Sequence, residues 1–333
     1  MRFLVSFLVA SATIQGAAFA QSTFDKVVKQ KSVTCGVAGN LAGFSNLDYK
    51  GEMQGIDSDL CRAIAAAMNV APKFKALTAT TRFTALQSGE IDVLTRNTTQ
   101  TMSRDTKLGF DFAGVNYYDG QGFLVPKSTK VTSVKGLDGA TICVQSGTTT
   151  ELNLNDYFKR NKLKFKSVLF ETFEDTNKAY MAGRCDAYTT DASGLAAIRA
   201  GLKVPTDHIL LPEIISKEPL GPVVRQDDPK WANVVRWTLN VLITAEEKGI
   251  TKSNVKNQAK NPDPEVQRML GLTGSLGEDA GLSKDWAVRV LSTVGNYGEI
   301  FEHNLGTATS LKLERGLNQL WSKGGLLYSP PFN

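Results

Sequence analysis

Apolar and polar positions follow two alternating rhythms along this chain. Short apolar runs rich in β-branched residues, such as "SVTCGVAG" (32–39) and "ATICVQSG" (140–147), are each followed by a longer stretch with helical spacing. In residues 55–68 this spacing places Leu60 and Ile64 on one stripe that can be buried. The alternation predicts an α/β fold with mostly parallel sheets.

A pattern of twelve residues occurs twice. "LQSGEIDVLTRN" (86–97) and "YMAGRCDAYTTD" (180–191) both read as a helix end, a glycine, an aspartate, a short apolar strand and polar residues. The glycines, Gly89 and Gly183, suit the left-handed position after a helix. Each copy ends at the carboxyl end of a strand, at Asn97 and at Asp191, where open α/β sheets bind ligands. We expect two similar lobes, although a chance match over twelve residues remains the alternative.

Two connecting stretches, residues 119–140 and 217–231, predict where the chain crosses between the lobes. Each joins a short apolar strand to residues rich in glycine, serine, lysine or proline. We expect a second lobe inserted into the first, and a mostly helical tail. The predicted ranges are 21–124 and 220–333 for lobe one, 125–219 for lobe two and 258–333 for the tail within lobe one.

The first twenty residues have the features of a cleaved secretory leader. Arg2 precedes an apolar stretch, and Ala18-Phe19-Ala20 is a small-x-small cleavage pattern. The apolar stretch is too short to span a bilayer, and no later segment reaches the roughly 20 apolar residues that a span requires. We therefore expect an exported, soluble protein of 313 residues (333 − 20), long enough for two domains.

Charge and histidine content exclude several classes of function. Without Arg2 the chain has 37 (38 − 1) basic and 33 acidic residues, a mild excess with no long run of one sign, so no nucleic-acid partner is expected. The two histidines, His208 and His303, are far apart in sequence, which argues against a catalytic dyad or a zinc site. We expect no metal and no cofactor.

Four cysteines in an exported chain favour disulfides, and four cysteines allow three pairings. We prefer Cys35 with Cys61 and Cys143 with Cys185, because each pair joins a strand to an element soon after it in one predicted lobe. Four free buried thiols are the alternative.

The stretch "TRNTTQTMSRDTKLGFDF" (95–112) places Asn97, Thr99 and Thr101 at alternate positions just before Arg104. Each of them has an ordinary alternative role, as a helix cap or as a solvated surface residue. Together, small hydrogen-bonding groups followed by a guanidinium favour a ligand that carries a carboxylate.

The predicted second lobe offers a matching helix start in "QSGTTTEL" (145–152). Gly147 permits a tight turn, and Thr148 to Glu151 fits a capping box, which is common at ordinary helix starts. Free N–H groups at this position attract anions. We expect the backbone near Thr149 to face the same ligand.

Asp191 discriminates between a simple anion and a zwitterion. A carboxylate facing an anion site would repel the ligand, and leaving a buried charge unpaired is costly. An α-amino acid resolves the conflict, because its ammonium can meet Asp191, Thr99 and Asn97 while its carboxylate meets Arg104. The alternative role for Asp191 is the N-cap of the helix that follows.

These stretches, with "GIDSDLCRAIAAAM" and the closing "WSKGGLLYSPPFN", resemble the polar amino-acid substrate-binding proteins of ATP-binding-cassette (ABC) importers over nearly the whole mature chain. The resemblance implies a type II-like periplasmic binding fold with a hinge of two crossover strands. It also implies a periplasmic monomer that takes an L-amino acid and meets the importer's membrane permease subunits. Within the family, Arg104, Thr99 and Thr149 correspond to ligand-carboxylate residues, and Asp191 corresponds to the ammonium partner.

The first loop of the chain departs from many relatives. They place an aromatic ring over the ligand side chain, whereas this chain has Leu41 at that point, with Phe44 nearby. We expect Leu41 and Phe44 to form a permissive side-chain pocket. Arg96 is expected mainly in a structural role, and it could pair with acidic ligand side chains if it reached the cleft.

The sequence therefore predicts a two-lobed receptor of broad amino-acid range that closes on its ligand by a hinge movement. The runner-up is a periplasmic enzyme of the same fold, such as a dehydratase acting on a small carboxylate. Its catalytic acid or base would have to come from Glu52, Asp57 or Glu151, and each of these has an ordinary surface or capping explanation.

Overall fold

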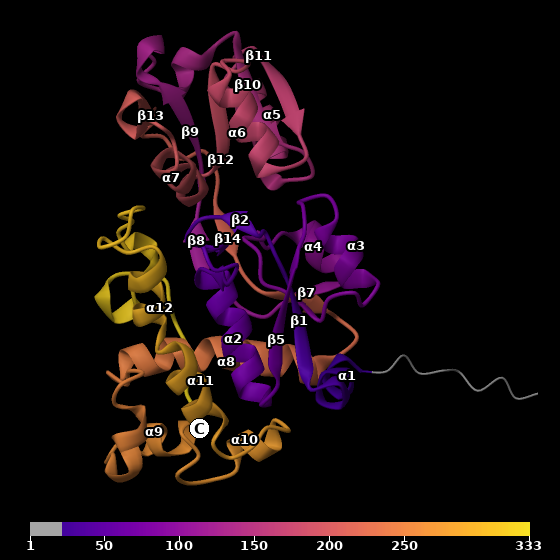
Figure 1. Ribbon diagram of the computed structural model, residues 1–333, viewed down its shortest axis with the longest axis vertical. Helices are drawn as coiled ribbons and strands as arrows, with labels where there is room; N and C mark the ends of the chain where they lie inside the picture. The colour runs from indigo at the N-terminus through magenta and orange to yellow at the C-terminus, as the bar shows by residue number, and fades with distance from the viewer. Residues whose placement is uncertain (1–21) are drawn as a thin grey trace, which may run out of the picture.

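The computed structural model describes residues 22–333 and has two α/β lobes, one above the other in Figure 1. The predicted leader, residues 1–20, lies outside the described residues. Within residues 22–333, no helix combines the length and the apolar character needed to cross a bilayer. The predicted α/β class with two lobes is confirmed, since each lobe has its own five-stranded sheet.

The sheet of lobe one has the order β5-β1-β6-β15-β7. Strand β1 is parallel to β5 and β6, while β15 enters from far along the chain and is antiparallel to β6 and β7. The strands are β1 (Ser32–Val37), β5 (Ala71–Ala76), β6 (Val93–Leu94), β7 (Phe110–Phe112) and β15 (Val223–Arg225). The helices of this lobe are α1 (Thr23–Gln30), α2 (Ile56–Met68), α3 (Arg82–Gln87), α4 (Met102–Thr106) and α8 (Pro229–Glu247).

The sheet of lobe two has the order β11-β10-β12-β9-β13, with β10 parallel to β11 and β12, and β9 antiparallel to β12 and β13. The strands are β9 (Gln121–Pro126), β10 (Ala140–Gln145), β11 (Phe165–Phe170), β12 (Ala187–Asp191) and β13 (His208–Leu210). The helices are α5 (Thr149–Arg160), α6 (Phe173–Met181) and α7 (Ala192–Ala200).

Two short antiparallel strands, β8 (Tyr117–Asp119) and β14 (Glu218–Leu220), connect the lobes. They lie between the two lobes in Figure 1. Residue 125, the predicted start of lobe two, falls inside β9, so the strand bounds favour a border near residue 120.

A small sheet and several 3-10 turns complete the lobes. The sheet has the order β2-β3-β4, with strands β2 (Asn40–Leu41), β3 (Ser45–Leu47) and β4 (Met53–Gln54). The turns are η1 (Lys127–Thr129), η2 (Val134–Leu137), η3 (Pro205–Asp207), η4 (Val255–Lys260), η5 (Gly316–Asn318) and η6 (Trp321–Lys323).

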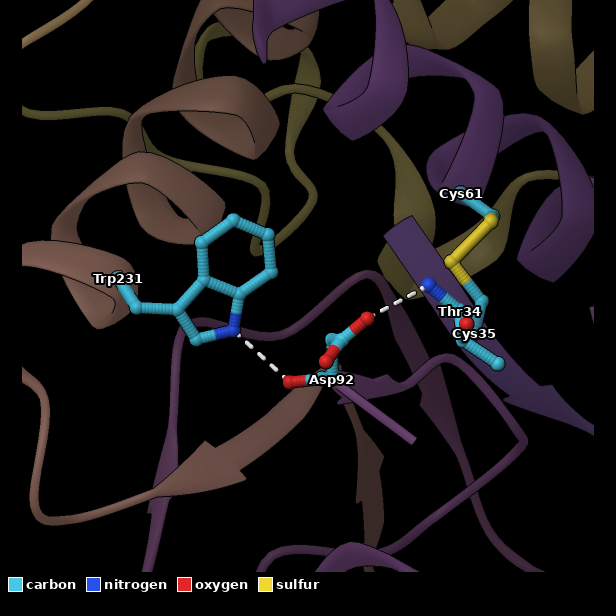
Figure 2. Close-up of a disulfide and its surroundings, with 5 residues drawn as sticks. All are labelled: Thr34, Cys35, Cys61, Asp92 and Trp231. Atoms are coloured by element: carbon cyan, nitrogen blue, oxygen red, sulfur yellow. Dashed lines mark hydrogen bonds between the residues drawn. A yellow bond between two sulfur atoms is a disulfide. The ribbon is translucent and has the colours of Figure 1, made fainter. Parts of the chain in front are cut away.

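The repeated sequence pattern has a common structural cause. In the first copy, Asp92 accepts a hydrogen bond from Thr34 N, and its own backbone N donates to Thr34 O. In the second copy Asp186 makes the same pair of contacts with Thr141. Each aspartate thus aligns the strand that ends at the cleft with the first strand of its lobe. In lobe one, the Trp231 indole also donates to Asp92 O, which fastens α8 to this junction (Figure 2).

The preferred cysteine pairing is observed. Cys35 on β1 is bonded to Cys61 on α2, and Cys143 on β10 is bonded to Cys185 just before β12. Figure 2 shows the first of these beside the Asp92 junction. Both bonds lie within one lobe and join elements that reach the cleft, so they stiffen each lobe separately and leave the hinge free.

The tail packs on lobe one. Its helices are α9 (Pro264–Met269), α10 (Leu276–Asp279), α11 (Trp286–Val294) and α12 (Tyr297–Asn304), and irregular chain and 3-10 turns follow to residue 333. Arg289 on α11 donates to the carbonyls of Ala66 and Ala67, which lie near the end of α2. Tyr297 on α12 donates to Asn116 O, just before the hinge strand β8.

Candidate functional site

A small cavity of about 20 Å³ lies between the two lobes. Its walls include Asn97 and Thr99 from the segment after β6, and Thr149 and Asp191 from the start of α5 and the end of β12. The strand-end positions of the two sequence copies therefore face one cleft. A cavity this small has room for about one water, so a ligand requires the lobes to separate first.

Asn97 and Asp191 meet across the cleft. Asn97 Nδ2 donates to Asp191 Oδ2 over 3.1 Å. Asn97 Oδ1 is buried and has no hydrogen-bond partner among residues 22–333. Burial, and then the nearby Asp119 and Glu218, raise the pKa of Asp191 well above its usual value. Among residues 22–333, Asn97 Oδ1 is therefore a buried acceptor without a donor, and the Asp191 carboxylate forms no ion pair.

Asp191 occupies the N-cap position of α7, yet its side chain makes no capping hydrogen bond. Asp191 therefore has the position of a helix N-cap, but its side chain does not cap the helix. Thr101, in contrast, does cap a helix, because its side chain accepts a hydrogen bond from Arg104 N at the start of α4. Of the three alternate residues noted in the sequence, Asn97 and Thr99 therefore line the cavity, whereas Thr101 caps helix α4.

Glu218 on β14 joins the two lobes at the cavity, and the sequence analysis did not single it out. Its Oε2 accepts from the hydroxyls of Thr99 and Thr149, the latter over 2.9 Å. Its Oε1 accepts from Asn153 Nδ2 and Ser216 Oγ, each over 2.7 Å. A hydroxyl has one proton, so Thr99 and Thr149 are left with lone pairs to offer a ligand. In this geometry their oxygens suit an ammonium rather than a carboxylate.

A group of buried guanidinium groups lies on the lobe-one side. Arg104 and Arg82 both lie over the Phe83 ring, at 5.0 and 4.8 Å from its centroid. Arg104 also donates to Thr99 O. Arg82 lines the cavity, whereas Arg104 is in contact with the residue that does. Arg82 was missed in the sequence, where it is a single cation at the start of a short helix.

The lowered pKa values of these guanidinium groups indicate that too little negative charge lies near them. Burial lowers the pKa of Arg82 well below its usual value, and Arg96 and Arg104 lower it further. Burial also lowers the pKa of Arg104 to about 10, against an opposing effect of Glu218 and Asp191. A ligand carboxylate placed here would supply the missing charge.

The predicted capping box at α5 forms in a modified way. The Thr148 side chain accepts from Glu151 N, as predicted, but the Glu151 carboxylate accepts from Gly147 N rather than from Thr148. Gly147 has a φ of 72°, a left-handed value that favours glycine. Thr148, Thr149 and Thr150, at the start of α5, line the cavity.

Phe173, at the start of α6, is the aromatic ring at this cavity, and no sequence signal identified it. Leu41 lies with Phe173 on the wall of a neighbouring cavity. Phe44 is buried against Tyr117, at 5.3 Å between ring centroids, and lines neither cavity. Of the two residues predicted for a side-chain pocket, Leu41 therefore lines a cavity and Phe44 lines neither, and the aromatic ring at both cavities, Phe173, belongs to lobe two.

The residues considered above for catalysis or metal binding do not line this cavity. Asp57, whose pKa burial raises to about 7, is already bonded to Asn97 N and Asn116. His208 lies against Tyr180 on lobe two, and His303 lies on α12. In the part of the chain that the structure describes, no group of three or more His, Cys, Asp or Glu residues could hold a metal ion.

The family described as "Bacterial extracellular solute-binding proteins, family 3" matches residues 33–252. The chain is 54% identical to the "General L-amino acid-binding periplasmic protein AapJ" of Rhizobium johnstonii, over 98% of each chain. It is 52% identical to the "Glutamate/glutamine/aspartate/asparagine-binding protein BztA" of Rhodobacter capsulatus, over 97% of each.

A solved structure from Brucella ovis, an "ABC transporter / periplasmic binding protein" with glutathione bound, is similar in fold and sequence. It superposes with a TM-score of 0.92 at 53% identity, and the match covers 94% of this chain and 100% of the other. Because it covers 94% of this chain, this match extends into the tail, whereas the family match ends at residue 252.

Proposed function

This chain belongs to the bacterial extracellular solute-binding proteins of family 3, and from that premise we propose that its cleft captures L-amino acids by pairing both of their charges. The observation that carries the proposal is the arrangement around Asn97. On one side the Asn97–Asp191 contact leaves a buried acceptor unused, and on the other side Arg82 and Arg104 are short of negative charge.

The ligand ammonium binds at Asp191, Asn97 Oδ1 and the Thr99 hydroxyl. Asp191 supplies the opposite charge, and Asn97 Oδ1 supplies a neutral acceptor. The Thr99 hydroxyl already donates its hydrogen bond to Glu218, so its oxygen can accept from a cation. An ammonium with three donors can be satisfied by these three acceptors.

The ligand carboxylate binds on the side of Arg104 and Arg82, next to Thr99 and the start of α5 at Thr149. Because the hydroxyl protons of both threonines point to Glu218, backbone N–H groups and the guanidinium groups remain as the donors. Leu41 and Phe173 offer apolar contact to the side chain. Few polar demands on the side chain agree with a broad ligand range.

The names of the relatives agree with this range. One is a general L-amino-acid-binding protein, one binds glutamate, glutamine, aspartate and asparagine, and one structure contains glutathione, whose glutamyl end has the same charged pair. These relatives confirm the periplasmic location and a receptor rather than an enzyme, because all three are described as binding proteins and span nearly the whole chain.

Capture follows from hinge closure about β8 and β14. Lobe one binds the carboxylate first, and lobe two completes the site with Asp191 and Thr149, so only a ligand with both charges stabilises the closed form. The protein acts as a monomer that presents this closed form to the permease subunits of an ABC importer. No cofactor and no nucleic acid take part.

The test compares L-leucine with two analogues that each lack one charge, 4-methylpentanoate and 3-methylbutylamine. Isothermal titration calorimetry should show tight binding of L-leucine and at least 100-fold weaker binding of each analogue. A thermal-shift screen of the twenty amino acids and several sugars should raise the Tm with several amino acids and with no sugar. Equal binding of leucine and either analogue would contradict the proposal.

A further inference from the structure

A second and larger cavity adjoins the one between the charged groups. It has a volume of about 140 Å³, against about 20 Å³ for the inner one. Arg96, Gln145 and Phe173 line both cavities, so the two share a wall. The side chain of an amino acid whose two charged groups sit in the inner cavity can therefore extend past Arg96 into this outer space, which shares Asn40 and Phe173 with the cavity beside Leu41.

Arg96 is held in place but incompletely used. Its residue is 3% exposed, its Nε donates to Leu77 O over 3.1 Å, and its guanidinium lies 5.7 Å from the centre of the Phe173 ring. Within residues 22–333 it forms no ion pair, and Nε makes the one hydrogen bond of this guanidinium. Two Nη groups of a buried cation are thus left for whatever enters the outer cavity.

The walls of the outer cavity add no competing carboxylate. Its other polar side chains are Asn40, Thr78, Gln145 and Thr172, which are all neutral. Glu171 lies at its edge, where its Oε1 accepts from the Thr80 hydroxyl over 3.0 Å. Asp57 and Asp191 attract the Arg96 guanidinium without forming an ion pair with it. The outer cavity therefore contains a fixed positive charge within a lining that is otherwise neutral, part polar and part apolar.

We propose that Arg96 is a specificity-determining residue that binds the side-chain carboxylate of dicarboxylic L-amino acids. This inference rests on the proposed capture of amino acids by the cleft. The planar fork of a guanidinium matches a carboxylate in two parallel hydrogen bonds. Neutral side chains enter the same space without that contact, so the protein takes both classes and prefers the acidic one. Arg96, rather than Arg104, then decides between glutamate and glutamine.

The experiment measures the Kd of L-glutamate, L-glutamine and L-leucine by isothermal titration calorimetry for the wild type and for Arg96→Gln and Arg96→Lys. Glutamine has the shape of glutamate without its charge, so the ratio of the two Kd values isolates the second carboxylate. Arg184→Gln removes an exposed arginine of lobe two and serves as the matched control.

Arg96→Gln should weaken glutamate binding by 10- to 100-fold and change glutamine and leucine binding by less than about 3-fold, with Arg96→Lys intermediate. An equal loss for all three ligands would overturn the proposal and make Arg96 a structural residue. No loss for glutamate would also overturn it. If the wild type binds none of the three, the proposed function itself has failed, which is a distinct result.

A measurement on the wild type guards against a variant that does not fold. Lowering the pH from 7 to 4 protonates the side chain of free glutamate, whose ordinary pKa is about 4.3. At pH 4 about two-thirds of free glutamate has a protonated side chain, so the preference for glutamate over glutamine should fall by about 3-fold, since other groups in the site affect both ligands alike. A preference that stays constant over this range would contradict the assignment of Arg96.

Discussion

Asn97 Nδ2 lies 3.1 Å from Asp191 Oδ2, although 94 positions separate the two residues and each belongs to a different lobe. Each residue ends one copy of the repeated sequence pattern. Together with the Thr99 and Thr149 hydroxyls, which lie 3.3 Å apart, the contact joins the two lobes at the charged cavity, and among residues 22–333 it leaves Asn97 Oδ1 without a partner. A ligand ammonium would insert between these two side chains and satisfy both.

The first prediction concerns Asp191. Asp191→Asn keeps the shape of the side chain and removes its charge, so a ligand ammonium would be buried without a counter-charge. Loss of one partner of a buried ion pair costs about 2–5 kcal/mol, which corresponds to at least a 30-fold rise in the Kd of L-leucine. Titration calorimetry measures this, and Asp156→Asn, at an exposed position on α5 of the same lobe, is the control that should stay within about 3-fold.

The second prediction separates Arg104 from Arg96. Arg104→Gln should weaken leucine, glutamine and glutamate by the same factor of at least 30, because all three have the α-carboxylate that Arg104 serves. Arg82→Gln should act in the same direction, since Arg82 lines the cavity beside it. Arg160→Gln, at an exposed position on α5, should leave binding unchanged. A loss limited to glutamate in Arg104→Gln would place the α-carboxylate elsewhere.

The fold and half of the site could be predicted from the sequence, because both follow from local patterns. Asp92 and Asp186 recur at the same place in two copies, and the rule that ligands bind at strand ends directs attention to Asn97 and Asp191. The sequence analysis did not predict three residues at the cavity, Arg82, Phe173 and Glu218. No motif in their sequence neighbourhood indicates a role in binding. Their roles arise only when the lobes close and β14 returns between them.

The third prediction uses the pKa of Asp57, which burial raises from its usual 3.8 to about 7. Between these values the folded protein holds a proton that the unfolded chain has lost, so this group's contribution to stability is present at low pH and is lost as the pH rises toward 7. Each pKa unit corresponds to about 1.4 kcal/mol. Over the two units from pH 5 to 7, Asp57 therefore contributes about 3 kcal/mol at most.

Asp57→Asn cannot titrate and should lack this dependence. The measurement is the Tm of the unliganded protein at pH 5 and pH 7.5, taken as the difference between wild type and variant. This difference is needed because Asp119, whose pKa burial raises to about 6, also makes the stability depend on pH over this range. The wild type should gain more than Asp57→Asn on acidification, and parallel changes would show that Asp57 titrates normally.

The last prediction assigns the tail a part in the hinge. Asn318 in η5 accepts a hydrogen bond from Tyr118 N over 2.7 Å and donates from Nδ2 to Tyr118 O over 3.1 Å. Tyr118 lies in the hinge strand β8, whose neighbours Tyr117 and Asp119 pair with β14. Asn318 is 3% exposed. The tail thus satisfies the backbone on one edge of the strand about which the lobes move.

Asn318→Ala would leave both backbone groups of Tyr118 without their partner. We expect a loss of about 1–3 kcal/mol in the free energy of unfolding, the usual cost of an unsatisfied buried polar group. We also expect a change of at least 3-fold in the dissociation rate of L-leucine, because the strand is freer to bend. Stopped-flow fluorescence measures the rate, and a thermal melt measures the stability.

Asn304→Ala is the matched control. Asn304 also belongs to the tail and donates to Asp59 on α2 over 2.7 Å, but this contact lies within lobe one and away from the hinge. It should lower the Tm to a similar extent and leave the dissociation rate of leucine unchanged. If both variants leave that rate unchanged, the tail only stabilises lobe one; if both alter it equally, general loosening of lobe one, rather than the Asn318 contact with β8, controls ligand release.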